Sequence, residues 1–290
     1  MSEGATLGAT WTVREVLNWT REYFVGGGIV QPRLEAEILL AHSLDVDRLQ
    51  LYLAPDKPLS PKERERFRGL ITRRHSGEPL QQLTGEVSFF GLRFRVDRGA
   101  LIPRPETEEL VDHALRLTPR DRPVRCLDLG TGTGVIAVCL ARFLPLAAVT
   151  AVDMSTEALE LARSNASLHG VDDRVTFVCS DWFERIDGRF DLVAANPPYV
   201  ASGELCNLPR DIRCHEPLRA LDGGSDGLEA LRVLTASVPQ FLAENGTVVL
   251  EVGYDQAESV ARMLEEAGLG SVEIHRDIFG KERFIIAQCQ

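Results

Sequence analysis

Several features that would point to a particular class of protein are missing from this sequence. No C-x-x-C pair occurs among the six cysteines, and no apolar stretch approaches the roughly 20 residues that span a bilayer. The start, M-S-E-G-A-T-L-G, has no basic segment before an apolar run, so no secretory signal is predicted. We therefore expect a soluble, cytoplasmic protein with reduced cysteines. Cys126, Cys139 and Cys179 fall within apolar strand or helix patterns, and we expect their thiols to be buried.

Lysine is also scarce, and acidic residues outnumber basic ones. Lysine occupies only positions 57, 62 and 281, and the formal net charge is −11. Nonspecific affinity for DNA comes largely from Lys and Arg, so this balance argues against a surface built mainly to neutralise phosphates, although a local basic patch remains compatible with it. With 290 residues, 44% of them hydrophobic, the chain can bury a substantial core as one large domain or two.

The first quarter of the chain has the periodicity of helices. Pro32 and Pro61 stand where first-turn prolines are common, and three glycines at 26–28 separate the first helix from the second. The segment E-V-S-F-F-G-L-R-F-R-V then alternates around Gly91 as a hairpin would. We expect a helical substrate-docking domain at residues 1–76, a β-hairpin linker at 77–102 and a third part at 103–290.

Beyond Pro123, short apolar strands alternate with helical segments. This alternation predicts an α/β fold with a mostly parallel sheet and helices on both faces. Ligands of such sheets bind at the carboxyl ends of the strands. The predicted strands include 124–129, 149–153, 174–181, 190–195 and 247–252.

A glycine-rich turn follows the first of these strands. It reads D-L-G-T-G-T-G, residues 128–134, and leads into a helix. Glycines let a backbone approach a ligand closely, and the N-terminus of a helix favours polar or negative groups. The spacing is G-x-G-x-G, unlike the G-x-G-x-x-G of dinucleotide-binding sheets, and no P-loop lysine follows it.

The next two strands end in acidic residues. Asp153 stands where a carboxylate can accept hydrogen bonds from both ribose hydroxyls. Asp181 offers an acceptor for an exocyclic amine, and Trp182 offers a ring beside a base. Each acid alone could equally cap the helix that follows it. Together with the glycine turn they predict a nucleoside pocket, and the missing dinucleotide spacing favours S-adenosylmethionine over NAD.

The fourth strand is followed by N-P-P-Y, residues 196–199. Proline cannot donate to a sheet ladder, so the strand must stop at Asn196. An amide or exocyclic amine nitrogen attacks a methyl sulfonium poorly, because its lone pair is delocalised. The Asn196 side-chain oxygen and the Pro197 carbonyl can each accept one N–H and orient that nitrogen, while Tyr199 packs on the flat acceptor group. A plain Asn-Pro turn is the alternative.

This arrangement resembles the Asn-Pro-Pro-Tyr class of S-adenosylmethionine-dependent N-methyltransferases, and more closely the bacterial release factor glutamine methyltransferases. The resemblance covers essentially the whole chain. It rests on E-P-L-Q-Q-L-T-G-E (78–86), L-I-P-R-P-E-T-E (101–108), L-D-L-G-T-G-T-G (127–134), N-P-P-Y-V (196–200), E-P-L-R-A-L-D-G-G (216–224) and D-I-F-G-K-E-R-F (277–284).

The resemblance implies a class I, Rossmann-like methyltransferase domain behind a small helical domain and a hairpin linker. It implies that S-adenosylmethionine is converted to S-adenosylhomocysteine without a metal. The methyl acceptor would be the side-chain N5 of the glutamine in the Gly-Gly-Gln motif of class 1 peptide chain release factors. The expected cofactor-binding residues are Gly130, Thr131, Gly132, Thr133, Gly134, Asp153, Asp181, Trp182 and Asn196. The expected catalytic residues are Asn196, Pro197 and Tyr199, and Pro198 joins them in binding substrate.

Other candidates remain open. Arg104 and Glu106 either face the cofactor or form an ordinary first helical turn. The loop 206–227, with His215 and Glu216, could close over substrate, whereas its one Cys-His neighbour pair lacks the regular spacing of metal ligands.

Other functions fit parts of the sequence. DNA adenine N6 methylation poses the same chemical problem, but such enzymes flip the base and usually carry a basic recognition domain. A non-enzymatic nucleoside-binding module would leave N-P-P-Y unexplained. A related family methylates a glutamine of a ribosomal protein, and its P-R-S-P pattern differs from P-R-P-E at 103–106 here. We therefore expect a monomeric enzyme that acts on release factors and binds no nucleic acid directly.

Overall fold

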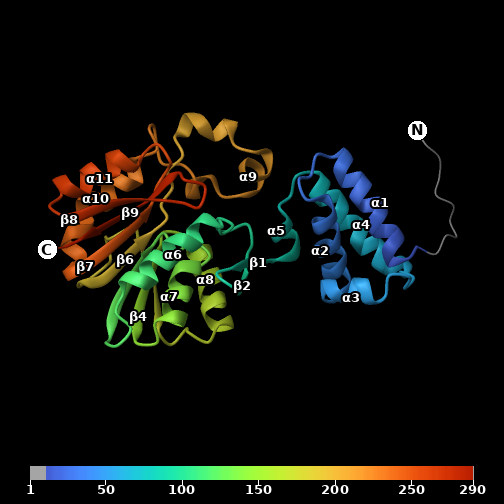
Figure 1. The fold of residues 1–290 in the computed structure, drawn as a ribbon, viewed down its shortest axis with the longest axis horizontal. Helices are drawn as coiled ribbons and strands as arrows, with labels where there is room; N and C mark the ends of the chain where they lie inside the picture. Colours follow the sequence, from blue (N-terminus) through green and yellow to red (C-terminus); the bar gives the residue numbers. More distant parts are fainter. Residues whose placement is uncertain (1–10, 290) are drawn as a thin grey trace. The chain divides into compact units, whose positions relative to one another are not determined.

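The computed structural model describes residues 11–289 and divides them into two compact units (Figure 1). The division falls between Gly85 and Glu86, within the stretch predicted as a linker. The first ten residues of the predicted helical domain lie outside the described residues. Within residues 11–289, no helix has the length and apolar character needed to cross a membrane.

The first unit is a small helical bundle, as predicted. The side chain of Thr12 caps the first helix in a capping box with Glu15, and Ser60 does the same with Glu63 at the start of the fourth. Phe24 lies fully buried in the unit's own hydrophobic core. The helices are α1 (Val13–Gly26), α2 (Pro32–Leu44), α3 (Arg48–Leu53), α4 (Pro61–His75) and α5 (Leu80–Thr84).

The second unit begins with the predicted hairpin. Strands β1 (Glu86–Phe89) and β2 (Leu92–Arg95) pair antiparallel, and the turn between them has positive φ at Phe90 and Gly91. Phe89 and Phe94 are buried and pack edge to face with ring centroids 6.0 Å apart. Both rings belong to the hydrophobic core of the second unit, so the hairpin is part of that unit.

A seven-stranded sheet forms the centre of the second unit, in the order β5-β4-β3-β6-β7-β9-β8. The first five strands of this order pair in parallel, and β9 runs antiparallel to both of its neighbours. The mostly parallel sheet predicted from the sequence is therefore confirmed. The strands are β3 (Val124–Leu129), β4 (Ala147–Asp153), β5 (Val175–Cys179), β6 (Phe190–Ala195), β7 (Leu242–Glu251), β8 (Gly270–Arg276) and β9 (Glu282–Gln288).

Helices cover both faces of this sheet (Figure 1). Successive strand residues point to opposite faces, so Cys126 packs in a core with α6 and α7, while Leu127 packs in a second core with α10 and α11. The helices of the second unit are α6 (Glu106–Leu117), α7 (Val135–Phe143), α8 (Thr156–Leu168), α9 (Arg210–His215), α10 (Glu229–Phe241) and α11 (Ala257–Glu266), and the 3-10 turns are η1 (Ser202–Asn207) and η2 (Leu218–Ala220).

The prediction of buried cysteines is only partly correct. Cys126 and Cys139 are buried, and burial raises the pKa of the Cys126 thiol to about 12. Cys179, which the sequence places in an apolar strand, is exposed. The reason is that β5 is the edge strand of the sheet, so its last residues have no neighbouring strand on one side.

Candidate active site

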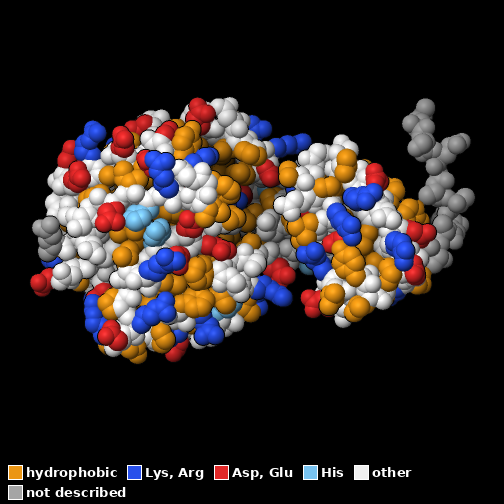
Figure 2. Space-filling model, viewed as in Figure 1, with side chains coloured by type: hydrophobic (Ala, Val, Ile, Leu, Met, Phe, Trp, Pro, Cys, Tyr) orange, Lys and Arg blue, Asp and Glu red, His pale blue; other side chains and the backbone are white. Residues whose placement is uncertain are grey.

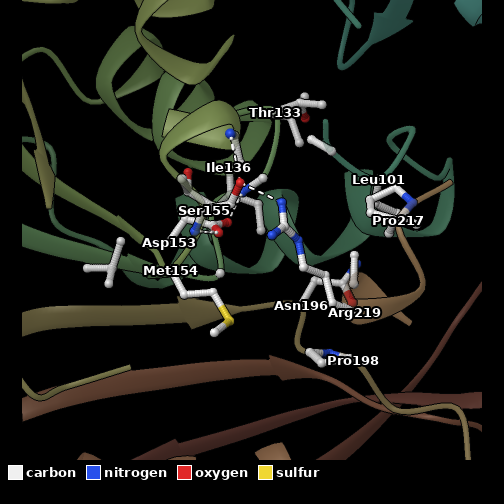
Figure 3. A pocket seen from close by; sticks show the side chains of 18 of the residues that line it. Leu101, Thr133, Ile136, Asp153, Met154, Ser155, Asn196, Pro198, Pro217 and Arg219 are labelled. Atoms are coloured by element: carbon white, nitrogen blue, oxygen red, sulfur yellow. Dashed lines mark hydrogen bonds between the residues drawn. The ribbon is translucent and has the colours of Figure 1, made fainter. Parts of the chain in front are cut away.

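The carboxyl ends of neighbouring strands bring the predicted motifs together. Leu129 of β3 lies opposite Val152 of β4 and Ala195 of β6. The residues that follow these three positions therefore leave the sheet side by side, next to a pocket (Figure 3). The predicted site residues that line this pocket are Gly130, Thr131, Gly132, Thr133, Asp153, Asp181, Trp182, Asn196 and Pro198.

Three predicted site residues are not among those that line the pocket. Gly134 is the N-cap of α7. Pro197 is buried, and Tyr199 is partly buried. The backbone carbonyl of Tyr199 accepts a hydrogen bond from Gln256 Nε2 at 2.9 Å, which holds the segment after β6 in place. The expected packing of the Tyr199 ring on a substrate stays a prediction.

The glycine turn has the backbone conformation that its sequence predicts. Gly130, Gly132 and Gly134 all have positive φ, a region that glycine adopts without a steric penalty. Between them, the amide of Thr131 donates to the carbonyl of Val152 at 2.8 Å. This bond ties the turn to the end of β4.

The second and third glycines have different roles. A Cβ at Gly134 would lie 2.9 Å from the Cβ of Ala162 on α8, whereas a Cβ at Gly132 would meet nothing nearer than 3.9 Å. We expect Gly134→Ala to destabilise the fold by about 1–3 kcal/mol through overpacking, in addition to the strain of a left-handed backbone. Gly132→Ala carries the same backbone strain without the overpacking, so it should destabilise the fold less, and it should weaken cofactor binding because Gly132 lines the pocket.

Thermal unfolding together with calorimetry on S-adenosylmethionine separates these two effects. Equal melting temperatures for the two variants would contradict the assignment of Gly134 to packing.

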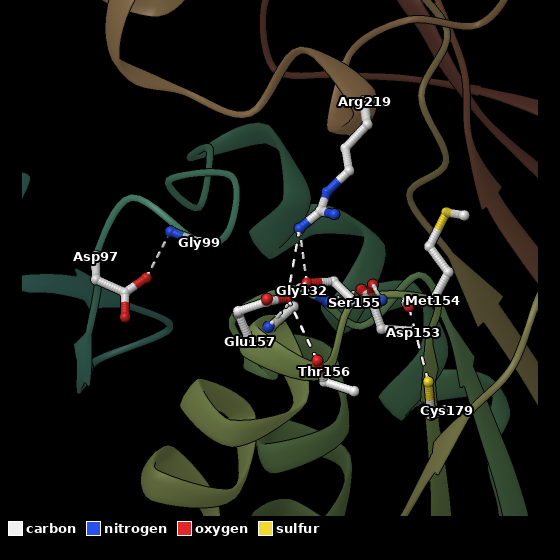
Figure 4. Close-up of polar contacts among 11 residues, drawn as sticks. Asp97, Gly99, Gly132, Asp153, Met154, Ser155, Thr156, Glu157, Cys179 and Arg219 are labelled. Atoms are coloured by element: carbon white, nitrogen blue, oxygen red, sulfur yellow. Dashed lines mark hydrogen bonds and ion pairs between the residues drawn. The ribbon is translucent and has the colours of Figure 1, made fainter.

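Asp153 holds the glycine turn as well as lining the pocket. Its Oδ2 accepts from the amide of Gly132 at 2.9 Å, and its Oδ1 accepts from the amide of Ser155 at 2.9 Å (Figure 4). A carboxylate has about four acceptor positions, so these two bonds leave capacity for the predicted ribose hydroxyls. The same side chain therefore shapes the turn and lines the pocket, and its contact with a ribose stays a prediction.

Asp128 is a functional candidate that the sequence reasoning missed. It is fully buried, and its Oδ2 accepts from Thr131 Oγ1 at 2.6 Å and from the amide of Ala137 at 3.0 Å. The other oxygen, Oδ1, has no hydrogen-bond partner among the described residues. Burial raises the pKa of Asp128 to about 7. The signal was present in the sequence, since this aspartate opens the D-L-G-T-G-T-G motif.

This raised pKa predicts a dependence of stability on pH. The Asp128 carboxyl ionises near 3.8 in an unfolded chain and near 7 in the folded one. Between these pH values the folded chain holds a proton on Asp128 that the unfolded chain has released. The contribution of Asp128 to the free energy of unfolding is therefore largest below pH 3.8 and is lost as the pH rises through 7. We expect Asp128→Asn to remove this contribution to the slope of the free energy of unfolding against pH. Urea unfolding of both proteins between pH 4 and pH 8 measures it, and parallel stability curves would contradict the prediction.

Trp182 stands beside the first glycine. A Cβ at Gly130 would lie 3.5 Å from the Trp182 ring, and Trp182 itself has a positive φ of 42°. Asp181 is exposed, while Trp182 is partly buried. This places an aromatic ring against the glycine turn, where the sequence predicts the base of a nucleoside.

Asn196 begins the segment after β6 and lines the pocket (Figure 3). Its Nδ2 donates to Thr107 Oγ1 at 2.9 Å. Thr107 lies in the first turn of α6 and is another residue that the sequence reasoning missed. The bond directs the amide nitrogen of Asn196 towards α6 and leaves the amide oxygen to accept from a ligand.

The segment at 216–220 runs along the pocket and is held at both ends. Glu216 is buried and accepts from Arg104 Nη2 at 2.7 Å and from the amide of Ile102 at 3.1 Å. Arg219 Nη2 donates to Ser155 Oγ at 2.7 Å (Figure 4). Arg104 and Arg219 line the pocket, and Glu106 is not among the lining residues. Closure of the 206–227 loop over substrate stays a prediction.

These residues fit S-adenosylmethionine. The glycine turn lines the pocket, the Asp153 carboxylate lies at the end of β4, and the Trp182 ring lies next to the turn. In residues 11–289, no group of three or more His, Cys, Asp or Glu side chains is placed to hold a metal ion.

Comparisons with protein families match both units. Residues 15–85 match the family described as PrmC N-terminal domain, and residues 109–209 match the family described as Methyltransferase small domain. Two solved structures show the fold: a methyltransferase from Pyrococcus furiosus, and the 16S rRNA N2 G1207 methyltransferase of T. thermophilus in complex with AdoMet and guanosine. The first has a TM-score of 0.53 and 20% identity over 75% of this chain and 96% of that one. The second has a TM-score of 0.51 and 18% identity over 71% of this chain and 50% of that one.

Curated relatives match over nearly the whole chain. The release factor glutamine methyltransferase of Geobacter sulfurreducens is 44% identical over 276 residues, which cover 95% of this chain and 96% of that protein. The release factor glutamine methyltransferase of Rhodopirellula baltica is 41% identical over 287 residues, which cover 96% of each chain.

Proposed function

This chain belongs to the release factor glutamine methyltransferases, and we propose that it methylates the side-chain N5 of the glutamine in the Gly-Gly-Gln motif of class 1 release factors. S-adenosylmethionine is the methyl donor. The position of Asn196 is the main support for an amide nitrogen as the methyl acceptor. Asn196 follows β6 next to the glycine turn, and its side-chain nitrogen is hydrogen-bonded to Thr107.

The chemical problem is the weak nucleophilicity of an amide nitrogen. Bound S-adenosylmethionine supplies a methyl group on a positively charged sulfur. Asn196 Oδ1 and the Pro197 carbonyl each accept one N–H of the substrate amide, which fixes its nitrogen in the attacking position. This is catalysis by positioning and by preorganised acceptors. The nitrogen gains the methyl group and loses one proton to solvent.

Charge supports a protein substrate over DNA. The chain carries a formal net charge of −11. On the face shown in Figure 2, basic and acidic side chains are interspersed over the surface. A duplex-binding surface would instead gather Lys and Arg along the path of the phosphates. We therefore infer that no nucleic acid binds directly.

We also infer that the protein acts as a monomer in the cytoplasm. The pocket is lined by a single chain, and both the glycine turn and the N-P-P-Y segment contribute residues to it. Release factors act on cytoplasmic ribosomes, so their methylation is expected in the same compartment.

The test is incubation of the protein with labelled S-adenosylmethionine and a purified class 1 release factor. We expect peptide mass spectrometry to place one methyl group on the side chain of the Gly-Gly-Gln glutamine. A factor whose motif reads Gly-Gly-Ala is the matched control and should stay unlabelled. An unmodified factor alongside duplex DNA that gains N6-methyladenine, or alongside a labelled ribosomal protein, would overturn the proposal.

A further inference from the structure

A chain of hydrogen bonds runs from Asn196 to a buried carboxyl group. Asn196 Nδ2 donates to Thr107 Oγ1 at 2.9 Å, and Thr107 Oγ1 donates to Glu251 Oε2 at 2.8 Å. The hydroxyl of Tyr199 donates to the other oxygen, Glu251 Oε1, at 3.5 Å. A single carboxyl group thus contacts the first residue of N-P-P-Y through Thr107 and the last residue directly.

The fold places these groups together from distant parts of the sequence. Ala195 of β6 pairs with Leu250 of β7, so Asn196, which follows β6, lies level with Glu251, the last residue of β7. Thr107 reaches both from the first turn of α6. Thr107 is 3% exposed and Glu251 is 1% exposed, so the hydrogen bonds between them are shielded from water.

The direction of each bond follows from the chemistry of the acceptor. An ionised carboxylate only accepts hydrogen bonds, so the single proton of the Thr107 hydroxyl goes to Glu251. The lone pairs of Thr107 Oγ1 are then what remains for Asn196. Only the NH2 group of the Asn196 amide can donate to them, because an amide oxygen against those lone pairs would repel.

We propose that Thr107 and Glu251 are positioning residues that set which way the Asn196 amide faces. With its nitrogen held on Thr107, Asn196 presents its oxygen to the substrate amide, which needs an acceptor. A flipped Asn196 would present a donor and lose the substrate N–H bond. Through the Tyr199 hydroxyl, Glu251 also restrains the other end of the tetrapeptide. This inference rests on the proposed function and adds two residues to it.

Burial of Glu251 makes the orientation of Asn196 sensitive to pH. Burial raises the pKa of Glu251 to about 7; Arg283 on β9 opposes this shift, and Glu106 on α6 adds to it. Burial also raises the pKa of Tyr199 to about 12, so its hydroxyl keeps its proton. Below pH 7 a protonated Glu251 can donate to Thr107, which frees the Thr107 proton for the Asn196 oxygen. The orientation of Asn196 is then no longer enforced.

The first test compares substitutions of Thr107. Thr107→Val keeps the shape of the side chain and removes its hydroxyl, and we expect kcat to fall about 100-fold with KM for the release factor nearly unchanged. Thr107→Ser, which keeps the hydroxyl, should restore kcat to within about threefold. The matched control is Thr118→Val at the other end of α6, where the lost hydroxyl donates to the carbonyl of Ala114 at 2.7 Å. Wild-type kcat in Thr107→Val would overturn the inference.

The second test uses Glu251→Gln, which also covers the case in which Thr107→Val does not fold. In wild-type protein the single-turnover rate should rise with pH through about 7, and Glu251→Gln should remove this rise. Asp128 has a similar pKa, so Asp128→Asn is the control: its absolute rate can change, but its rate normalised to its own maximum should keep the rise with pH. A rise that persists in Glu251→Gln would assign it to another group and overturn the role of Glu251.

A third readout does not depend on methyl transfer. In NMR spectra of the wild-type protein, the side-chain NH2 of Asn196 should be protected from hydrogen exchange with solvent. This protection should be lost in Thr107→Val. Wild-type protein that leaves the glutamine unmodified would refute the proposed function. Protection that is unchanged in Thr107→Val would refute only the positioning role, so the two failures are distinguishable.

Discussion

Asn196→Ala should lower kcat by about 100-fold to 1000-fold, because the substrate amide loses a preorganised acceptor. Affinity for S-adenosylmethionine should fall much less than kcat, since the glycine turn and Asp153 are untouched and Asn196 is only one of the expected cofactor contacts. Single-turnover kinetics with a release factor and calorimetry with the cofactor measure the two quantities. The fold should persist, because Asn196 lies after the end of β6 and contributes nothing to the sheet ladder.

Asn196→Asp is the sharper variant of this experiment. It keeps an acceptor for the substrate but places an oxygen opposite Thr107 Oγ1, where the wild-type protein has a donor at 2.9 Å. We expect it to be impaired as well, since the donor to Thr107 is lost and a negative charge is added. Full single-turnover activity in Asn196→Ala would mean that N-P-P-Y is only a turn that ends a strand.

Removal of residues 1–85 should lower kcat/KM on an intact release factor by about 100-fold, while activity on a short Gly-Gly-Gln peptide changes little. The reason is effective concentration: a docking domain that grips the body of the factor keeps the glutamine near the pocket. The remaining chain should fold alone, because among residues 11–289 the hydrophobic cores of the second unit and the side chains packed against them begin at Val87.

Far-ultraviolet circular dichroism and binding of S-adenosylmethionine check that the shortened protein is folded. Steady-state kinetics on both substrates then show whether kcat/KM falls more on the intact factor than on the peptide. Equal losses on factor and peptide would show that residues 1–85 support the catalytic unit, and would contradict a docking role.

The sequence by itself determined the architecture and the class of site. Alternating strand and helix patterns predicted the mostly parallel sheet, because strands buried on both faces need helices to cover them. The positions of the G-x-G-x-G turn and of N-P-P-Y at strand ends were also predicted, since glycine permits the positive φ of a tight turn and proline cannot continue a strand. Parallel strands bring their carboxyl ends to one edge, so the sequence also predicted that these motifs meet.

The tertiary structure alone decided which other residues act on the site. Thr107 and Glu251 lie 144 positions apart, and no local pattern indicates that they share a hydrogen bond. Only the tertiary structure shows that Asp153 holds the amide of Gly132, because that contact depends on how the turn folds back over β4. Cys179 was misjudged for the same reason: an apolar pattern predicts a strand, but strand order decides whether that strand has neighbours on both sides. Local patterns encode backbone conformation, whereas burial and side-chain contacts arise from the packing of distant segments.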